Sequence, residues 1–398
     1  MRRFRIGSAF GIPIKLDLTF LLVLPLFAVV IAIQVETWTD MLNQFWAADI
    51  DPQPLVASPV SWALGLTAAL GLFAGIVLHE LGHSLVAMRY GVAIDSITLW
   101  LFGGIAQLEE FPEEWQQELY VAIAGPVVSV ALGGISYGTF LLVPPSETLA
   151  LEATRFLLGY LAVMNVALAV FNMLPGFPMD GGRVLRALLV RTRPYAQATK
   201  IAAEVGKGFA ILLGLAGVFV VFNPFLIALA FFIYIGASTE AQQTIVRAAF
   251  EGVVVADIMT PADRVQTVEE ETSVAALTER MLADRHTGYP VERDGEIVGI
   301  VTLEDARAVR EVEQDAYTVG DVMSTEIHTT APNADVMEAL TEMQENSIGR
   351  LVVADEEFAG LLTRSDVMTA LSIIKTSGRF DSPASESGET GDWQSRPE

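Results

Sequence analysis

Apolar residues gather in six long runs over the first 250 residues, and beyond that point the apolar runs shorten to the length of β-strands. The first run follows a short basic segment and has no signal-peptide cleavage pattern, so we interpret it as a membrane span. The expected spans cover residues 16–34, 61–90, 118–143, 156–190, 205–222 and 224–241. The pattern predicts a polytopic α-helical membrane protein.

Two segments interrupt the helical pattern. Residues 94–108 are rich in β-branched residues and are broken by Gly103 and Gly104, which predicts a short β-hairpin. Open strand edges are unstable in lipid, so this hairpin must lie against protein or a water-filled cavity. The fourth expected span contains LPGFPMDGG, whose prolines and glycines break a continuous helix.

The charges between the spans predict their orientation. Residues 35–59 contain four acidic residues, no lysine or arginine, and two tryptophans, so the positive-inside rule places them outside the cell. Residues 183–207 are the densest basic segment and are expected in the cytosol. Six crossings then return the chain to its starting side. We therefore expect a multi-pass protein of the cell membrane with a cytosolic N-terminus.

A tandem repeat follows the membrane domain. VADIM at 255–259 recurs as VGDVM at 319–323, and GIVTLED at 299–305 recurs as GLLTRSD at 360–366. Each copy is predicted to fold as strand, helix, strand, strand, helix. We expect a membrane domain at 1–250, two repeat domains of the α/β class, and a disordered acidic tail. The domains after the first cover residues 251–313, 314–376 and 377–398.

Composition sharpens this division. The chain is 52% hydrophobic and 18% charged, which is typical of membrane proteins. Of the net charge of −24, −20 lies after residue 250, and this acidity argues against a nucleic-acid partner. Only four lysines accompany twenty arginines, and an acidic, lysine-poor surface resembles proteins of high-salt cytoplasm, which suggests a halophilic source. Because cysteine is absent, any metal site must use nitrogen and oxygen ligands.

The candidate chemistry lies in the second expected span, where HELGH places His79, Glu80 and His83 inside a long apolar run. Histidines four residues apart leave one face of a helix and can hold one metal ion. An isolated HExxH pattern also occurs by chance in proteins that bind no metal. Inside a bilayer such polar residues are costly and usually functional, which favours a zinc site near the cytosolic surface.

A catalytic zinc site needs three protein ligands and an open position, so a third ligand is required. Asp180 is the only carboxylate in the fourth expected span and is expected at the depth of HELGH. His286 and His328 lie in the repeat domains and are poor candidates. An isolated Asp-Gly-Gly is also typical of a turn or a helix cap, so both interpretations stay open at this point.

Together, HELGH and NMLPGFPMDGGR (172–183) resemble the site-2 protease family of intramembrane zinc metalloproteases, peptidase family M50. Their order along the chain is similar to that of the branch with C-terminal CBS (cystathionine-β-synthase) domains. The resemblance covers the chain to about residue 375. It implies one Zn²⁺ per chain held by His79, His83 and Asp180, with Glu80 as the general base and Asn172 near the scissile carbonyl. It also implies a single-span membrane protein as substrate.

The tandem repeat resembles a CBS pair, which implies contacts to the phosphate and ribose of an adenine nucleotide, AMP or ATP. The matching positions are Thr302 with Asp305 and Thr363 with Asp366. A CBS pair can instead serve only as a scaffold for a homodimer. The predicted hairpin has two readings as well: it can bind an unwound substrate by strand addition, or it can simply pack against the helices.

We expect an intramembrane zinc protease whose CBS pair regulates access. Two other classes remain open: a CBS-regulated transporter or channel, in which the buried charges line an ion path, and a non-catalytic membrane scaffold. The transporter explains the CBS pair but not the paired histidines with the distant Asp-Gly-Gly.

Overall fold

The computed structural model describes residues 3–100, 103–108, 114–355 and 357–376. The chain divides into two compact units, Met1–Gln242 and Gln243–Glu398. The division falls inside helix α9 (Pro224–Phe250), before the predicted domain end at residue 250. The predicted disordered tail, 377–398, lies outside the described residues.

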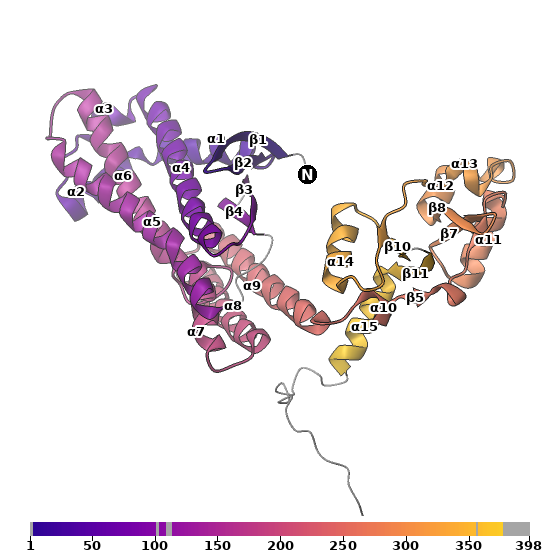
Figure 1. Ribbon diagram of the computed structural model, residues 1–398. Coiled ribbons are helices and arrows are strands. Elements are labelled where there is room, and N and C mark those ends of the chain that lie inside the picture. Colours follow the sequence, from indigo (N-terminus) through magenta and orange to yellow (C-terminus); the bar gives the residue numbers. More distant parts are fainter. Residues whose placement is uncertain (1–2, 101–102, 109–113, 356, 377–398) are drawn as a thin grey trace, which may run out of the picture. The chain divides into compact units, whose positions relative to one another are not determined.

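Five helices of the first unit are long and apolar enough to cross a membrane (Figure 1). Each has at least 24 residues and is therefore at least about 36 Å long, which exceeds the roughly 30 Å of a bilayer core. They are α4 (Val60–Arg89), α5 (Trp115–Leu142), α6 (Leu149–Asn172), α8 (Tyr195–Phe219) and α9. These helices confirm the prediction of a polytopic helical membrane protein.

The prediction that residues 16–34 form a single spanning helix is wrong. Its helix, α1 (Phe20–Ile33), has 14 residues, or about 21 Å, which is too short to cross alone. It bends by 62° into α2 (Val35–Trp46), and only this bent pair taken as one span brings the described helices to six crossings. Ile12–Asp17 forms a strand instead, and Asp17 at its end accepts hydrogen bonds from the amide and hydroxyl of Thr19, which precedes the helix.

A four-stranded sheet in the order β1-β2-β3-β4 accompanies the helices. The predicted hairpin is confirmed as antiparallel β3 (Ile94–Trp100) and β4 (Gly103–Leu108). A second hairpin, β1 (Arg3–Ala9) and β2 (Ile12–Asp17), was not predicted, and β2 joins β3 in parallel. The described sheet therefore has β1 and β4 as its edges.

Helix α4 lies at the centre of the first unit and contacts α1, α5, α6, β3 and β4. The fourth expected span is broken as predicted, because α6 ends at Asn172 and α7 (Asp180–Val190) begins after a seven-residue connection, 173–179. A Cβ atom on Gly181 would lie 2.3 Å from the Leu174 carbonyl oxygen. Glycine is thus required where α7 packs against the connection that precedes it.

The second unit confirms the predicted repeat. The first copy contains β6 (Val268–Glu269), α11 (Val274–Asp284), β7 (Gly288–Arg293), β8 (Glu296–Thr302) and α12 (Leu303–Ala308). The second contains β9 (Thr329–Thr330), α14 (Val336–Glu345), β10 (Arg350–Ala354), β11 (Phe358–Thr363) and α15 (Arg364–Thr376). Each copy follows the order strand, helix, strand, strand, helix.

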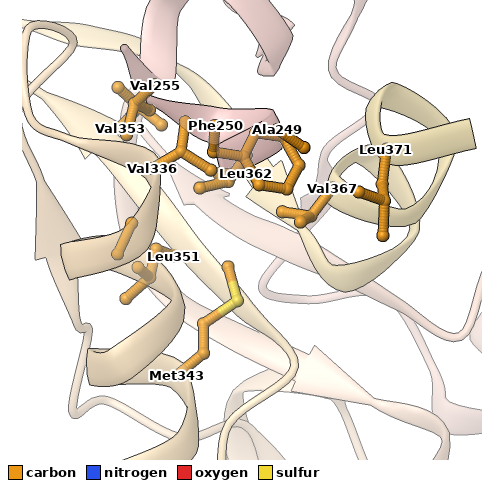
Figure 2. Packing of buried hydrophobic residues seen from close by; sticks show 11 residues of the cluster. Ala249, Phe250, Val255, Val336, Met343, Leu351, Val353, Leu362, Val367 and Leu371 are labelled. Atoms are coloured by element: carbon orange, nitrogen blue, oxygen red, sulfur yellow. The ribbon is translucent and has the colours of Figure 1, made fainter. Parts of the chain in front are cut away.

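The two copies are intertwined rather than separate. The sheets run β6-β7-β8 and β5-β11-β10-β9, so β5 (Thr260–Pro261) of the first copy joins the sheet of the second. Short helices precede the strands of both copies, α10 (Val255–Ile258) and α13 (Val319–Val322). Figure 2 shows the core of the second copy, in which Phe250 of α9 packs with Val336 and Leu362.

Candidate metal centre

His79 and His83 lie on one face of α4, as their spacing predicts. Their Nε2 atoms are 3.2 Å apart and their ring centroids 4.8 Å apart. The two residues are only 3% and 4% exposed, so neither imidazole is in contact with bulk solvent. The span thus presents two nitrogen ligands side by side inside the helical bundle.

Asp180 lies at the first position of α7 and joins the two histidines. Its Oδ2 atom is 3.2 Å from His79 Nε2 and 3.1 Å from His83 Nε2. Among the described residues, these three form the one group of at least three possible His, Asp or Glu ligands close enough to share an ion. The predicted meeting of the two segments, 101 residues apart for His79 and Asp180, is therefore present.

The spacing of the three atoms fits zinc. Bonds of about 2.0–2.2 Å in a tetrahedral site separate neighbouring ligand atoms by roughly 3.3–3.5 Å, close to the observed 3.1–3.2 Å. Three ligand atoms occupy three corners of such a tetrahedron. The donor set, two nitrogens and one oxygen, is that of a catalytic site with its fourth position open.

Helix α5 orients both imidazoles from behind. Nδ1 of His83 donates to the Val121 carbonyl at 2.7 Å, and Nδ1 of His79 lies 2.8 Å from the Ser129 hydroxyl. A proton on Nδ1 leaves the Nε2 lone pair of each ring free for a metal ion. The sequence analysis missed both partners, although a serine within an apolar span is a signal that could have identified Ser129.

Gly125 gives α5 its close approach. A Cβ atom at this position would lie 2.2 Å from His83 Nε2 and 2.7 Å from His79 Nε2, so no other residue fits without displacing the rings. The sequence indicated close helix packing at Ala124, Gly125 and Pro126, but it could not indicate that the glycine faces the ligand atoms. Gly125 is thus part of the site.

Glu80 lies between two faces of α4. The two histidines face α5, whereas Phe73 packs against Leu99 and Leu81 packs against Ile97, both of β3. Since successive residues of a helix are turned by about 100°, the side chain that follows His79 leaves α4 between these two faces. Glu80 is half-buried, and its carboxylate has no hydrogen-bond or ion-pair partner among the described residues. Its carboxylate is therefore not engaged by another side chain of the described part of the chain.

Asn172, the other predicted residue of this site, is the last residue of α6. It is half-buried, and its Nδ2 donates to the Leu168 carbonyl at 3.1 Å. This bond leaves the second amide hydrogen and the amide oxygen for other partners. Its role beside a scissile carbonyl stays a prediction.

The four residues predicted to bind nucleotide form two equivalent helix caps in the second unit. Asp305 Oδ2 accepts from the Thr302 amide at 2.8 Å and hydroxyl at 2.6 Å. Asp366 Oδ2 accepts from the Thr363 amide at 2.9 Å and hydroxyl at 2.7 Å. Each threonine hydroxyl in turn accepts from the backbone amide of its aspartate. These bonds are local and account for both pairs without a ligand.

Comparisons with known proteins agree with this geometry. Residues 67–155 and 143–215 match the sequence model of peptidase family M50, and residues 255–311 and 319–373 match that of the CBS domain. The chain is 34% identical to the zinc metalloprotease MJ0392 of Methanocaldococcus jannaschii, over 93% of this chain and 96% of that protein. It is also 34% identical to Rip3 of Mycobacterium tuberculosis, over 79% and 83% of the two chains.

A solved structure matches as well. The site-2 protease from Methanocaldococcus jannaschii is 35% identical and covers 60% of this chain and 95% of its own, with a TM-score of 0.42.

Proposed function

The chain belongs to peptidase family M50 and carries two CBS domains, and from this premise we propose that it is an intramembrane zinc endopeptidase that cleaves single-span membrane proteins. The observation that supports this most is the triangle formed by His79, His83 and Asp180 near Glu80, whose carboxylate has no hydrogen-bond or ion-pair partner among the described residues. All four residues lie on or next to helices that are apolar enough to span a bilayer. The arrangement is one of metal-assisted peptide hydrolysis.

Each residue has a distinct part in the reaction. Zinc held by the three ligands would polarise the scissile carbonyl and lower the pKa of a bound water to about 7. Glu80 would accept a proton from the attacking water as the water oxygen adds to the carbonyl carbon. Glu80 then delivers the proton to the amine nitrogen as the C–N bond breaks. The Val121 carbonyl, which can only accept, keeps the proton of His83 on Nδ1, and the Ser129 hydroxyl can accept the corresponding proton of His79.

Replacing Glu80 tests this proposal. We expect Glu80→Gln to reduce cleavage of a single-span substrate in vesicles by at least about 100-fold, since general bases contribute 10²–10⁴. One zinc per chain should remain bound, because the three ligands are unchanged. Cleavage by Glu80→Gln at the wild-type rate would refute the protease proposal. A wild-type chain that binds zinc, cuts nothing and conducts ions would instead favour a transporter.

We further propose that the substrate binds as an added strand. A helical substrate hides its carbonyls in hydrogen bonds, so a cleaved segment must unwind and find new backbone partners. Strand β4 is a free edge of the described sheet, and the sheet packs on the α4 face next to Glu80. Proline at Ile105 or at Ala106 removes one backbone amide donor. Successive amides of a strand point to opposite sides, so one of these two donors points away from β3, toward the edge where a substrate strand would bind. If both variants fold and cleave at the wild-type rate, the hairpin packs against the helices and does not bind the substrate.

For the CBS pair we propose adenine-nucleotide binding that regulates cleavage. Arg350 Nη2 donates to the Thr287 hydroxyl at 3.2 Å, and burial lowers the pKa of its guanidinium while the charge of Asp305 opposes that shift. Arg350 begins β10 of the second copy, and its side chain reaches Thr287 of the first copy. It thus brings a positive charge to an acidic unit, where phosphate needs a positive partner. Calorimetric titration of the full chain with AMP and ATP tests nucleotide binding. If neither nucleotide produced heat, the result would favour a CBS pair that serves only as a scaffold for a homodimer.

The membrane orientation is also a proposal, with the N-terminus and the CBS domains in the cytosol. Because the chain has no cysteine, single cysteines can report the topology without background. In intact cells a membrane-impermeant maleimide should label Ser58→Cys and should leave Ser372→Cys unlabelled until the cells are opened. The reverse pattern would invert the topology.

A further inference from the structure

One buried side chain connects the elements that build the metal centre. Arg186 lies on α7, six residues after Asp180, and is only 1% exposed. A buried guanidinium is costly unless it is paired and hydrogen-bonded. Its partners therefore show what it holds in place.

Arg186 is paired with two carboxylates from other helices. Its Nε donates to Glu118 Oε1 of α5 at 2.6 Å, and its Nη2 lies 2.5 Å from the same oxygen. Its Nη1 donates to Glu240 Oε1 of α9 at 3.0 Å. Glu118 is 4% exposed, so this pair lies almost entirely away from water.

Two aromatic rings complete its surroundings. The guanidinium carbon lies 4.9 Å from the ring centroid of Phe177 and 4.8 Å from that of Tyr195. Phe177 belongs to the connection that leads into Asp180, and Tyr195 is the first residue of α8. Arg186 thus contacts the chain before Asp180 as well as the helix after it.

Glu118 ties this cluster to the histidines. It precedes Val121 by three residues on α5, and the Val121 carbonyl accepts the hydrogen bond of His83. Gly125 and Ser129, which contact the two rings, follow on the same helix. A single ion pair therefore joins the helix that orients the histidines to the helix that supplies the carboxylate.

Helix α7 needs such an anchor. It has 11 residues, fewer than an isolated helix needs to be stable in water, and its first turn has no side-chain cap. A metal ligand loses affinity when it is displaced by much more than about 0.5 Å. The contacts of Arg186 oppose such a displacement of Asp180.

We propose that Arg186, held by Glu118, is a positioning residue that sets the place of Asp180 relative to His79 and His83. The inference rests on the proposed ligand set, to which it adds a residue that touches neither metal nor substrate. Loss of Arg186 then removes the ion pair between α7 and α5, and the carboxylate shifts away from the triangle of ligand atoms.

Arg155 provides a matched control in the same unit. It is also buried, at 5% exposed, and its guanidinium carbon lies 4.7 Å from the Phe140 ring centroid. It donates to the carbonyls of Ala48 and Val143, and Val143 follows the end of α5 that lies away from Glu118, 14 residues beyond Ser129. A defect that follows only from losing a buried arginine would appear in both variants.

The experiment compares Arg186→Met and Arg155→Met in the purified full chain. Zinc affinity is measured by chelator competition, and the visible spectrum of the cobalt-substituted protein reports the coordination geometry. We expect Arg186→Met to weaken zinc binding about 10- to 100-fold and to change the cobalt spectrum, as for other residues that orient metal ligands. Arg155→Met should lower the thermal midpoint while affinity and spectrum stay unchanged.

Milder variants decide the matter if Arg186→Met does not fold. Arg186→Lys keeps the charge but loses the forked geometry, and Glu118→Gln keeps the shape but loses the charge, so both should show a smaller loss of zinc affinity. Wild-type affinity and cobalt spectra in these variants, or an equal loss of affinity in Arg155→Met, would overturn the positioning role. If Asp180→Asn itself kept wild-type zinc affinity, the ligand set would fall instead.

Discussion

Asp180, Asp305 and Asp366 each lie in the first turn of a helix, yet those of the two units have different partners. In the second unit, Asp305 and Asp366 each bind the threonine three residues before them. In the first unit, Asp180 makes no cap for α7, and its carboxylate reaches histidines about 100 residues away in sequence. An aspartate in the first turn of a helix thus serves local stability in one unit and long-range assembly in the other.

The difference lies in what holds each helix. A capping box supplies its own hydrogen bonds, so α12 depends on few distant contacts for its first turn. Helix α7 has no such cap. Its start is fixed instead by Gly181, which packs closely on the preceding connection, and by Arg186, which pairs with two carboxylates. A freed carboxylate therefore requires tertiary contacts that a capped one does not.

Among the changes that test this comparison, we expect the largest effect on zinc binding at Gly125, in the first unit. Gly125→Ala places a methyl group 2.2 Å from His83 Nε2, so the imidazoles cannot keep their positions. We expect loss of stoichiometric zinc and of measurable cleavage, read by metal analysis of the purified protein and by a single-span substrate assay.

Gly134→Ala is the control on the same helix, because nothing lies within 4 Å of its Cβ position. It should bind zinc normally and unfold at an equal or higher temperature, since alanine favours helix by about 1 kcal/mol. Full zinc occupancy in Gly125→Ala would contradict the close approach of α5 to the ligands.

A smaller effect is expected at Ser129. Ser129→Ala removes the hydroxyl 2.8 Å from His79 Nδ1 and leaves the three ligands in place. We expect a 10- to 100-fold loss of zinc affinity or of activity, the usual cost of removing an orienting partner. Ser136→Ala, two turns further along α5, should keep the wild-type values in both assays. Equal values for the two variants would show that the hydroxyl does not orient His79.

Much of this arrangement could be predicted because its signals are local. Periodicity predicted α4 to within one residue at each end, and proline with glycine predicted the break before Asp180. The spacing of His79 and His83 predicted their shared face. The repeat predicted the order of elements in the second unit.

What could not be predicted depends on contacts between distant segments. The first hairpin replaces the start of the expected first span because β2 pairs with β3, about 80 residues later. Val121 enters the site through its backbone carbonyl, which no sequence pattern marks. Arg186 stood in a basic segment expected to face the cytosol, and only the fold shows it buried between Glu118 and Glu240.

The smallest expected effect sharpens the comparison from the side of the second unit. Asp305→Ala removes the carboxylate of the α12 capping box, whereas the Thr302 hydroxyl can still accept from the backbone amide of residue 305. We expect a loss of about 1 kcal/mol of unfolding free energy, the usual contribution of a hydrogen bond. The measurement is the thermal midpoint of the full chain together with its zinc content, with Asp366→Ala as the equivalent change in the second copy. Both variants should lower the midpoint of the second unit and keep one zinc per chain, because their carboxylates bind only their own helices. A loss of zinc in either variant would mean that the caps of the second unit also support the metal centre, and the division between local and long-range aspartates would no longer hold.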